Sequence, residues 1–166
     1  EITNKIKSSG FFYYESALSE KFINSITERF SSSDLALNIN YLSGIHTKTQ
    51  YFNTNILAIS KSFYELCTSK FILKICNLFL QSSDFRLKAV RYYETYKNNE
   101  MQWHTDTKTS KEFSEIEGLI FIIYITDVND GEFQYIEGSH TDSKDLKKND
   151  FTLKEISKLY SAKNII

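Results

Sequence analysis

The chain has 166 residues, of which 41% are hydrophobic and 25% are charged, a composition typical of one globular domain with a buried core. Its 20 Lys and Arg balance 21 Asp and Glu, and a net charge of -1 gives no general attraction for nucleic acid or for an anionic membrane. The longest apolar run, Leu119 to Ile125, is far shorter than the roughly 18 residues of a membrane span, and the 2 cysteines form no CxxC motif, so we expect a soluble cytoplasmic protein.

The first half of the chain is predicted to be mainly helical. Aromatic residues after Gly10 indicate a short strand up to Tyr14, and Ser19 is the expected N-cap of the helix that follows. Residues 31–53, which are rich in Ser, Asn and Thr, are predicted to be loop. Two further helices are indicated by apolar stripes, one of Ile56, Ile59, Phe63 and Leu66, and one capped by Ser69 with Ile72, Ile75, Leu78 and Phe79.

The second half switches to patterns typical of strands. Residues 85–93 alternate between two faces, and Gly118–Val128 is almost unbroken apolar sequence, which predicts a strand buried on both faces. Asn129-Asp130-Gly131 favours a tight turn into a return strand over residues 132–136. Near the end, Thr152 and Glu155 form a capping-box pattern that predicts a short helix through Tyr160.

His104 and Asp106 are the most informative polar residues. On an extended backbone, side chains two positions apart point to the same face, so this imidazole and this carboxylate can converge on one metal ion. A nitrogen and an oxygen ligand suit iron or manganese, and with a second His they make the facial triad of non-haem iron oxygenases. A His-x-Asp triplet also occurs by chance on solvated loops, so the spacing alone does not decide between the two interpretations.

The context of the triplet resembles a known family. Trp103-His104-Thr105-Asp106, the apolar strand ending at Asp127, and the segment from Gly131 through Gly138-Ser139-His140 are similar to the phytanoyl-CoA dioxygenase-like branch of the iron(II)/2-oxoglutarate oxygenases. The resemblance implies an α+β fold with a mainly β core, a double-stranded β-helix of the jelly-roll or cupin-like kind. It further implies one oxygenase-like domain over residues 1–166, with a helical support region over about 15–80 and the β core from about 85 onward.

The same resemblance implies the chemistry. His104 and Asp106 would bind Fe(II), and 2-oxoglutarate and O2 would serve the hydroxylation of a small organic substrate. The family closes its triad with a second His and anchors 2-oxoglutarate with a basic residue, and neither is visible before Ile166. Because the chain also begins at Glu1 rather than Met, we expect a fragment whose barrel is truncated at its C-terminal end and which can be inactive alone.

Four other residues are weaker candidates. Arg91 and Tyr93 lie on one face of the alternating segment and could contact the cosubstrate, although packing or solvation at a sheet edge is the commoner explanation for such residues. His140 directly follows the return strand, which favours a turn residue over a third metal ligand. Trp103 is expected to form a wall of the pocket.

Two other classes of function stay open. One is a non-catalytic β-helix domain that binds a ligand without turnover, and the other is a metal-dependent isomerase or hydrolase on a cupin-like barrel. Lys144, Lys147 and Lys148 alternate with Asp142, Asp145 and Asp150, so their charges cancel and no phosphate-binding stripe forms. We therefore expect a small-molecule substrate and neither a nucleic acid nor a membrane as partner; substrate identity and oligomeric state cannot be read from the sequence.

Overall fold

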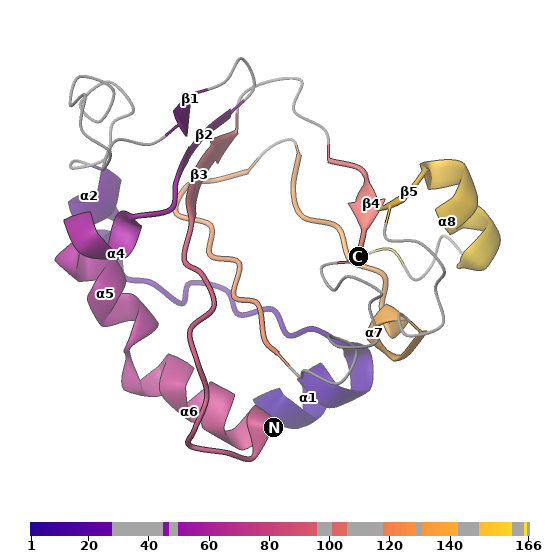
Figure 1. The fold of residues 1–166 in the computed structure, drawn as a ribbon, viewed down its shortest axis with the longest axis horizontal. Helices are drawn as coiled ribbons and strands as arrows, with labels where there is room; N and C mark the ends of the chain where they lie inside the picture. Colours follow the sequence, from indigo (N-terminus) through magenta and orange to yellow (C-terminus); the bar gives the residue numbers. More distant parts are fainter. Residues whose placement is uncertain are drawn as a thin grey trace. The chain divides into compact units, whose positions relative to one another are not determined.

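The computed structural model of the chain forms two compact units, each with its own core. Figure 1 shows the helices and strands of the chain. It describes residues 1–27, 45–46, 50–95, 101–105, 118–128, 131–142, 150–160 and 165. The terminal unit consists of Glu1–Tyr13, Glu100–Phe121 and Asn129–Ile166, and the central unit consists of Tyr14–Asn99 and Ile122–Val128. Within the described residues, no helix has the length and apolar character needed to cross a bilayer.

The central unit contains a three-stranded antiparallel sheet. Its strands are β1 (Ile45–His46), β2 (Gln50–Asn53) and β3 (Tyr92–Thr95), in the order β1-β2-β3. The prediction of a loop over residues 31–53 was therefore wrong for β1 and β2. Both strands are too short to show a hydrophobic alternation, and β2 is held by its pairing with β3, a partner some 40 residues away in the chain.

Four helices complete the central unit: α2 (Glu20–Thr27), α4 (Ile56–Ile59), α5 (Lys61–Cys67) and α6 (Lys70–Leu80). The predicted caps of α2 and α6 are confirmed, because the Ser19 and Ser69 hydroxyls each accept a hydrogen bond from the first turn, at 3.3 and 3.4 Å. The single helix predicted from Ile56 is interrupted at Ser60, whose backbone is extended.

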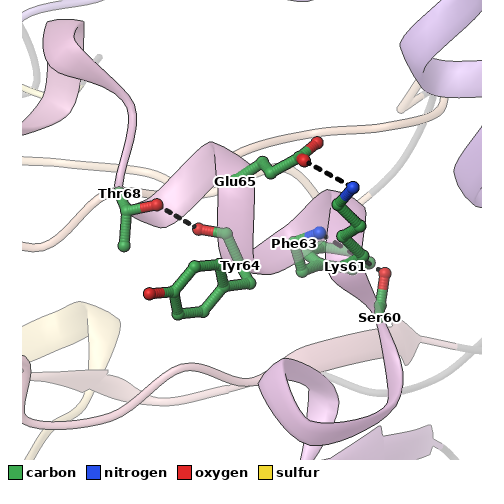
Figure 2. A network of polar contacts seen from close by, with 6 residues as sticks. All are labelled: Ser60, Lys61, Phe63, Tyr64, Glu65 and Thr68. Atoms are coloured by element: carbon green, nitrogen blue, oxygen red, sulfur yellow. Dashed lines mark hydrogen bonds and ion pairs between the residues drawn. The ribbon is translucent and has the colours of Figure 1, made fainter.

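Ser60 also caps α5, and its side chain accepts a hydrogen bond from the Phe63 amide at 3.3 Å (Figure 2). The exposed side of the same helix carries an ion pair between Lys61 and Glu65 at 3.4 Å. At its end, the Thr68 hydroxyl donates to the Tyr64 carbonyl at 2.8 Å. The same Ser thus ends one helix and satisfies a first-turn amide of the next.

The core of the central unit joins these helices to the sheet. Ile26 and Ile56 are completely buried, and the rings of Phe63 and Tyr92 meet edge to face with centroids 6.0 Å apart. Asn53 is 1% exposed, and its side-chain oxygen accepts a hydrogen bond from the Asn55 amide at 2.7 Å. This polar group is buried at the end of β2 with a partner, as burial requires.

The terminal unit begins with a helix that the sequence did not predict, α1 (Ile2–Ser9). Gly10 ends it in the left-handed conformation, with φ 86°, and its amide donates to the Ile6 carbonyl at 2.8 Å. The strand predicted for the aromatic residues after Gly10 is therefore wrong, since Gly10 serves as a helix cap and residues 11–14 form no strand. A methyl group on Gly10 would overlap with the Tyr135 hydroxyl and the His140 ring, so only glycine fits here.

The rest of the terminal unit holds two short strands and two helices. Strands β4 (Trp103–His104) and β5 (Asp150–Phe151) pair antiparallel, and the helices are α7 (Ser139–Asp142) and α8 (Leu153–Leu159). The capping box at Thr152 and Glu155 is confirmed, with both reciprocal hydrogen bonds formed. The core consists of Ile136, Phe151 and Ile156, with Trp103, Tyr160 and Ile165 against it.

Three predicted strands differ from the structure. The strand expected over residues 85–93 is limited to β3, and neither Gly118–Val128 nor residues 132–136 form a strand, apart from one isolated bridge of Ile136 to Ile165. Ile120 is 65% exposed, although its segment was predicted to be buried on both faces. An apolar run becomes a buried strand only where partners cover it, and none of the described residues pairs with this one. The double-stranded β-helix stays a prediction, since residues 96–100, 106–117 and 143–149 lie outside the described part.

Candidate metal site

The β4–β5 ladder has two faces with different environments. Trp103 lies opposite Phe151, and His104 lies opposite Asp150. Phe151 is buried, with Trp103 packed against the same core, whereas His104 and Asp150 are exposed. Because side chains alternate along a strand, burial of Trp103 and Phe151 directs His104 and Asp150 to the other face. A core on one side thus fixes an imidazole and a carboxylate on the opposite side.

The protonation of the His104 ring follows from its hydrogen bond. Its Nδ1 lies 2.8 Å from the Gln102 carbonyl oxygen, and a carbonyl can only accept, so Nδ1 donates. In the neutral ring the lone pair then resides on Nε2. Metal-binding histidines commonly donate one ring N–H to a backbone carbonyl, which fixes the tautomer and orients the ring. His104 therefore has the chemistry of a nitrogen ligand that presents Nε2.

Asp106, the second predicted ligand, lies outside the described residues, which resume at residue 118 after Thr105. Its convergence with His104 stays a prediction that follows from their spacing. Among the residues that are described, no group of three or more His, Cys, Asp or Glu side chains could hold a metal ion. Of the two predicted donors the structure describes only the His104 imidazole, a ligand type that iron and manganese accept.

Arg91 and Tyr93 are brought together, as their shared face predicted. The Arg91 guanidinium donates to the Tyr93 hydroxyl at 3.2 Å, and both side chains are exposed. They belong to the central unit, where Tyr93 lies in β3 and Arg91 directly precedes the strand. An oriented guanidinium is well suited to bind a carboxylate through two parallel hydrogen bonds, but contact with a cosubstrate stays a prediction.

His140 is tied to the first helix. Its Nε2 lies 3.1 Å from the Lys7 carbonyl oxygen, in the last turn of α1, and must be the donor. The Gly138 amide donates to the Ser9 carbonyl at 3.0 Å beside it. These two bonds satisfy carbonyls at the end of α1, which favours the interpretation of His140 as a turn residue that anchors the helix.

The sequence missed one polar neighbour of His104. Asp150 was interpreted only as one of several charges that cancel nearby lysines, yet it lies directly across the ladder from His104. The available signal was the alternation of polar Asp150 and apolar Phe151. A strand of two residues gives too short a pattern to reveal its partner, because the pairing joins positions 46 residues apart.

Comparison of the chain with protein-family models, with curated proteins and with solved structures finds no match. Its chemistry must therefore be argued from its own residues.

Proposed function

We propose that the protein is a non-haem Fe(II)/2-oxoglutarate-dependent oxygenase that hydroxylates a small organic substrate. The observation that carries the proposal is the Nδ1 hydrogen bond of His104 to Gln102, on a strand whose other face is anchored in a core. The resemblance of Trp103-His104-Thr105-Asp106 and of Gly138-Ser139-His140 to the oxygenase family supports it. We also propose the cytoplasm as its location, because its two cysteines are free thiols.

Each residue has a defined task in this proposal. His104 binds the metal through Nε2, and Asp106, two positions on, supplies a carboxylate oxygen. Trp103 holds the strand against Phe151 and so keeps the imidazole on the exposed face. Iron and 2-oxoglutarate supply the oxidising chemistry, whereas the protein supplies the ligands and their placement.

A metal titration tests the first step. We expect the protein to bind one Fe(II) or Mn(II) per chain in anaerobic calorimetry, and the His104→Ala, Asp106→Ala double variant to lose at least about 100-fold in affinity, since both ligands are removed. His46→Ala with Asp127→Asn is the matched control, with one imidazole and one carboxylate removed elsewhere. Affinity equal to that of the unmodified protein in the His104, Asp106 variant would refute the proposal.

A second measurement separates the oxygenase from the rival functions. Addition of 2-oxoglutarate to the anaerobic Fe(II) protein should produce a metal-to-ligand charge-transfer band in the visible spectrum. A metal-dependent isomerase or hydrolase would bind the metal without this band. A non-catalytic binding domain would not require the metal at all.

A further inference from the structure

We propose that helix α6, together with residues 81–88 that follow it, is a docking surface for an anionic lipid membrane. We call this surface the basic face, and its basic residues are Lys70, Lys74, Arg86 and Lys88. The inference does not depend on the oxygenase activity, because the basic face lies in the central unit and the candidate metal site lies in the terminal unit.

The basic face differs in charge from the rest of the chain. Residues 70–88 hold four basic residues and one acidic residue, Asp84, whereas the whole chain has a net charge of -1. All four basic side chains are exposed, and Lys70 and Lys74 lie one turn apart on α6. The net charge of the chain predicted no membrane partner, but an anionic surface within a Debye length of about 10 Å responds to the local charge.

Apolar side chains are exposed among these cations. Phe71 and Leu78 on α6 are 49% and 52% exposed, and Leu87 in the segment that follows is 61% exposed. Tyr14, which is also exposed, contacts Phe71 with ring centroids 5.9 Å apart. Exposed leucines and aromatic rings next to lysines are typical of helices that lie in a membrane interface, where apolar groups enter the lipid and cations meet the headgroups.

The fold connects the two parts of the basic face. The Asn77 side chain of α6 donates to the Ser82 carbonyl at 3.2 Å, which joins the helix to the turn after it. Burial of Ile75 determines which side of α6 faces the protein, and Val90 packs against the core of the central unit just beyond the basic face. The exposed cations and apolar side chains therefore belong to one stretch of the central unit whose inner side is anchored.

The apolar residues favour lipid over nucleic acid as the partner. Basic surfaces that bind single strands present aromatic rings on which the bases stack. The exposed apolar residues of the basic face include Leu78 and Leu87, which can enter a hydrocarbon layer but offer no ring to a base. An anionic membrane supplies both the phosphate charge and the apolar layer, so it matches both components of the surface.

Cosedimentation of the full chain with lipid vesicles tests the inference. We expect binding to vesicles of phosphatidylcholine and phosphatidylserine in equal parts, at least about ten-fold weaker binding to phosphatidylcholine alone, and loss of binding in about 1 M NaCl, where the Debye length is about 3 Å. Lys70→Gln with Lys74→Gln should weaken binding about 25-fold, since each cation near an anionic surface contributes about five-fold. Lys154→Gln with Lys158→Gln is the matched control and should leave binding unchanged, because these lysines are also exposed and one turn apart, on α8.

A second pair of variants separates docking from attraction by charge alone. Leu78→Gln with Leu87→Gln changes two exposed positions, so circular dichroism should show the fold retained, and binding should weaken at least about ten-fold because these side chains no longer enter the lipid. Leu153→Gln with Leu159→Gln makes the same change at exposed leucines of α8 and should leave binding unchanged.

Each of the other outcomes contradicts the inference. Equal binding to neutral vesicles, or no binding to either kind, would show that the cations do not recruit anionic lipid. An unchanged affinity in the leucine variant would mean that the protein is held by charge without docking. Tighter binding to polyuridine than to the vesicles would identify a nucleic acid as the partner, and an equal loss in the α8 controls would place the contact elsewhere.

Discussion

The two cores of the molecule differ in how completely their residues are buried and in which residues lie next to them. In the central unit, helices α2, α4 and α5 enclose Ile26 and Ile56 completely against Tyr92 of β3. In the terminal unit, Ile136, Phe151 and Ile156 are 5–6% exposed, and one of them sits on a strand only two residues long. The other residue of that strand, Asp150, is exposed opposite His104.

The contrast separates two uses of a hydrophobic core. The central core stabilises the helices and the sheet around it, and none of its residues neighbours a candidate metal ligand along its strand or helix. In the terminal unit, residues of the core alternate along β4 and β5 with exposed polar residues, among them the candidate ligand His104. Packing there determines where His104 and Asp150 point, so a loss of packing should also be a loss of the site.

The largest effect should come from Phe151→Ala. Removal of a buried aromatic ring costs about 4 kcal/mol of unfolding free energy, and Trp103 loses its partner across the ladder. We expect both lower stability in urea and weaker Mn(II) binding, measured at a temperature where circular dichroism shows the variant to be folded.

Phe151→Leu is the matched control, because it keeps an apolar side chain in the core and should cost about 1.5 kcal/mol or less. It should retain most of the Mn(II) affinity. Full affinity in a folded Phe151→Ala variant would show that the core and the metal site are independent, contrary to the comparison above.

Ile56→Ala should give the opposite combination. Ile56 is completely buried in the central core, and its truncation should cost about 3 kcal/mol of unfolding free energy. Mn(II) affinity of the folded variant should not change, because no residue of β4 or β5 belongs to this core. Ile56→Val should cost about 1 kcal/mol of unfolding free energy, so its stability should lie between those of the unmodified protein and of Ile56→Ala. A drop in affinity that follows the loss of stability in this series would abolish the distinction between the cores.

Local signals in the sequence predicted the features that depend on few neighbouring residues. The caps at Ser19, Ser69 and Thr152 each involve a hydroxyl and an amide three positions away, so the spacing suffices to predict them. Apolar periodicity, by contrast, failed at Ser60, because one apolar stripe continued across a break between two helices. Periodicity reports which side chains share a face, and it does not report whether the backbone remains helical between them.

Features that depend on distant partners could not be predicted in this way. Exposure of Ile120 and the pairing of His104 with Asp150 depend on which segments lie alongside, and neither segment encodes that by itself. For the site, the sequence predicted His104 from its spacing to Asp106, and it predicted that Arg91 and Tyr93 share a face. It gave no means to place Asp150, because a cross-strand neighbour is defined by register rather than by spacing.

The smallest expected effect concerns the thiols of the central unit. Burial raises the pKa of Cys67 and Cys76 above the ordinary value of 9.0, although a backbone hydrogen bond opposes the rise at Cys76. Because the folded state holds these protons more tightly than the unfolded state, their contribution to stability is complete below pH 9 and is lost as pH rises through the folded pKa values. A small fall in unfolding free energy above pH 9 should result.

Iodoacetamide labelling measures the same effect more directly. Since the thiolate is the reactive form, both cysteines of the folded protein should react more slowly at pH 8 than they do in urea. The Cys67→Ser, Cys76→Ser variant should lose the alkaline fall in stability, which identifies its source. Labelling at equal rates in the folded and unfolded chain would mean that α5 and α6 do not shield these thiols from solvent.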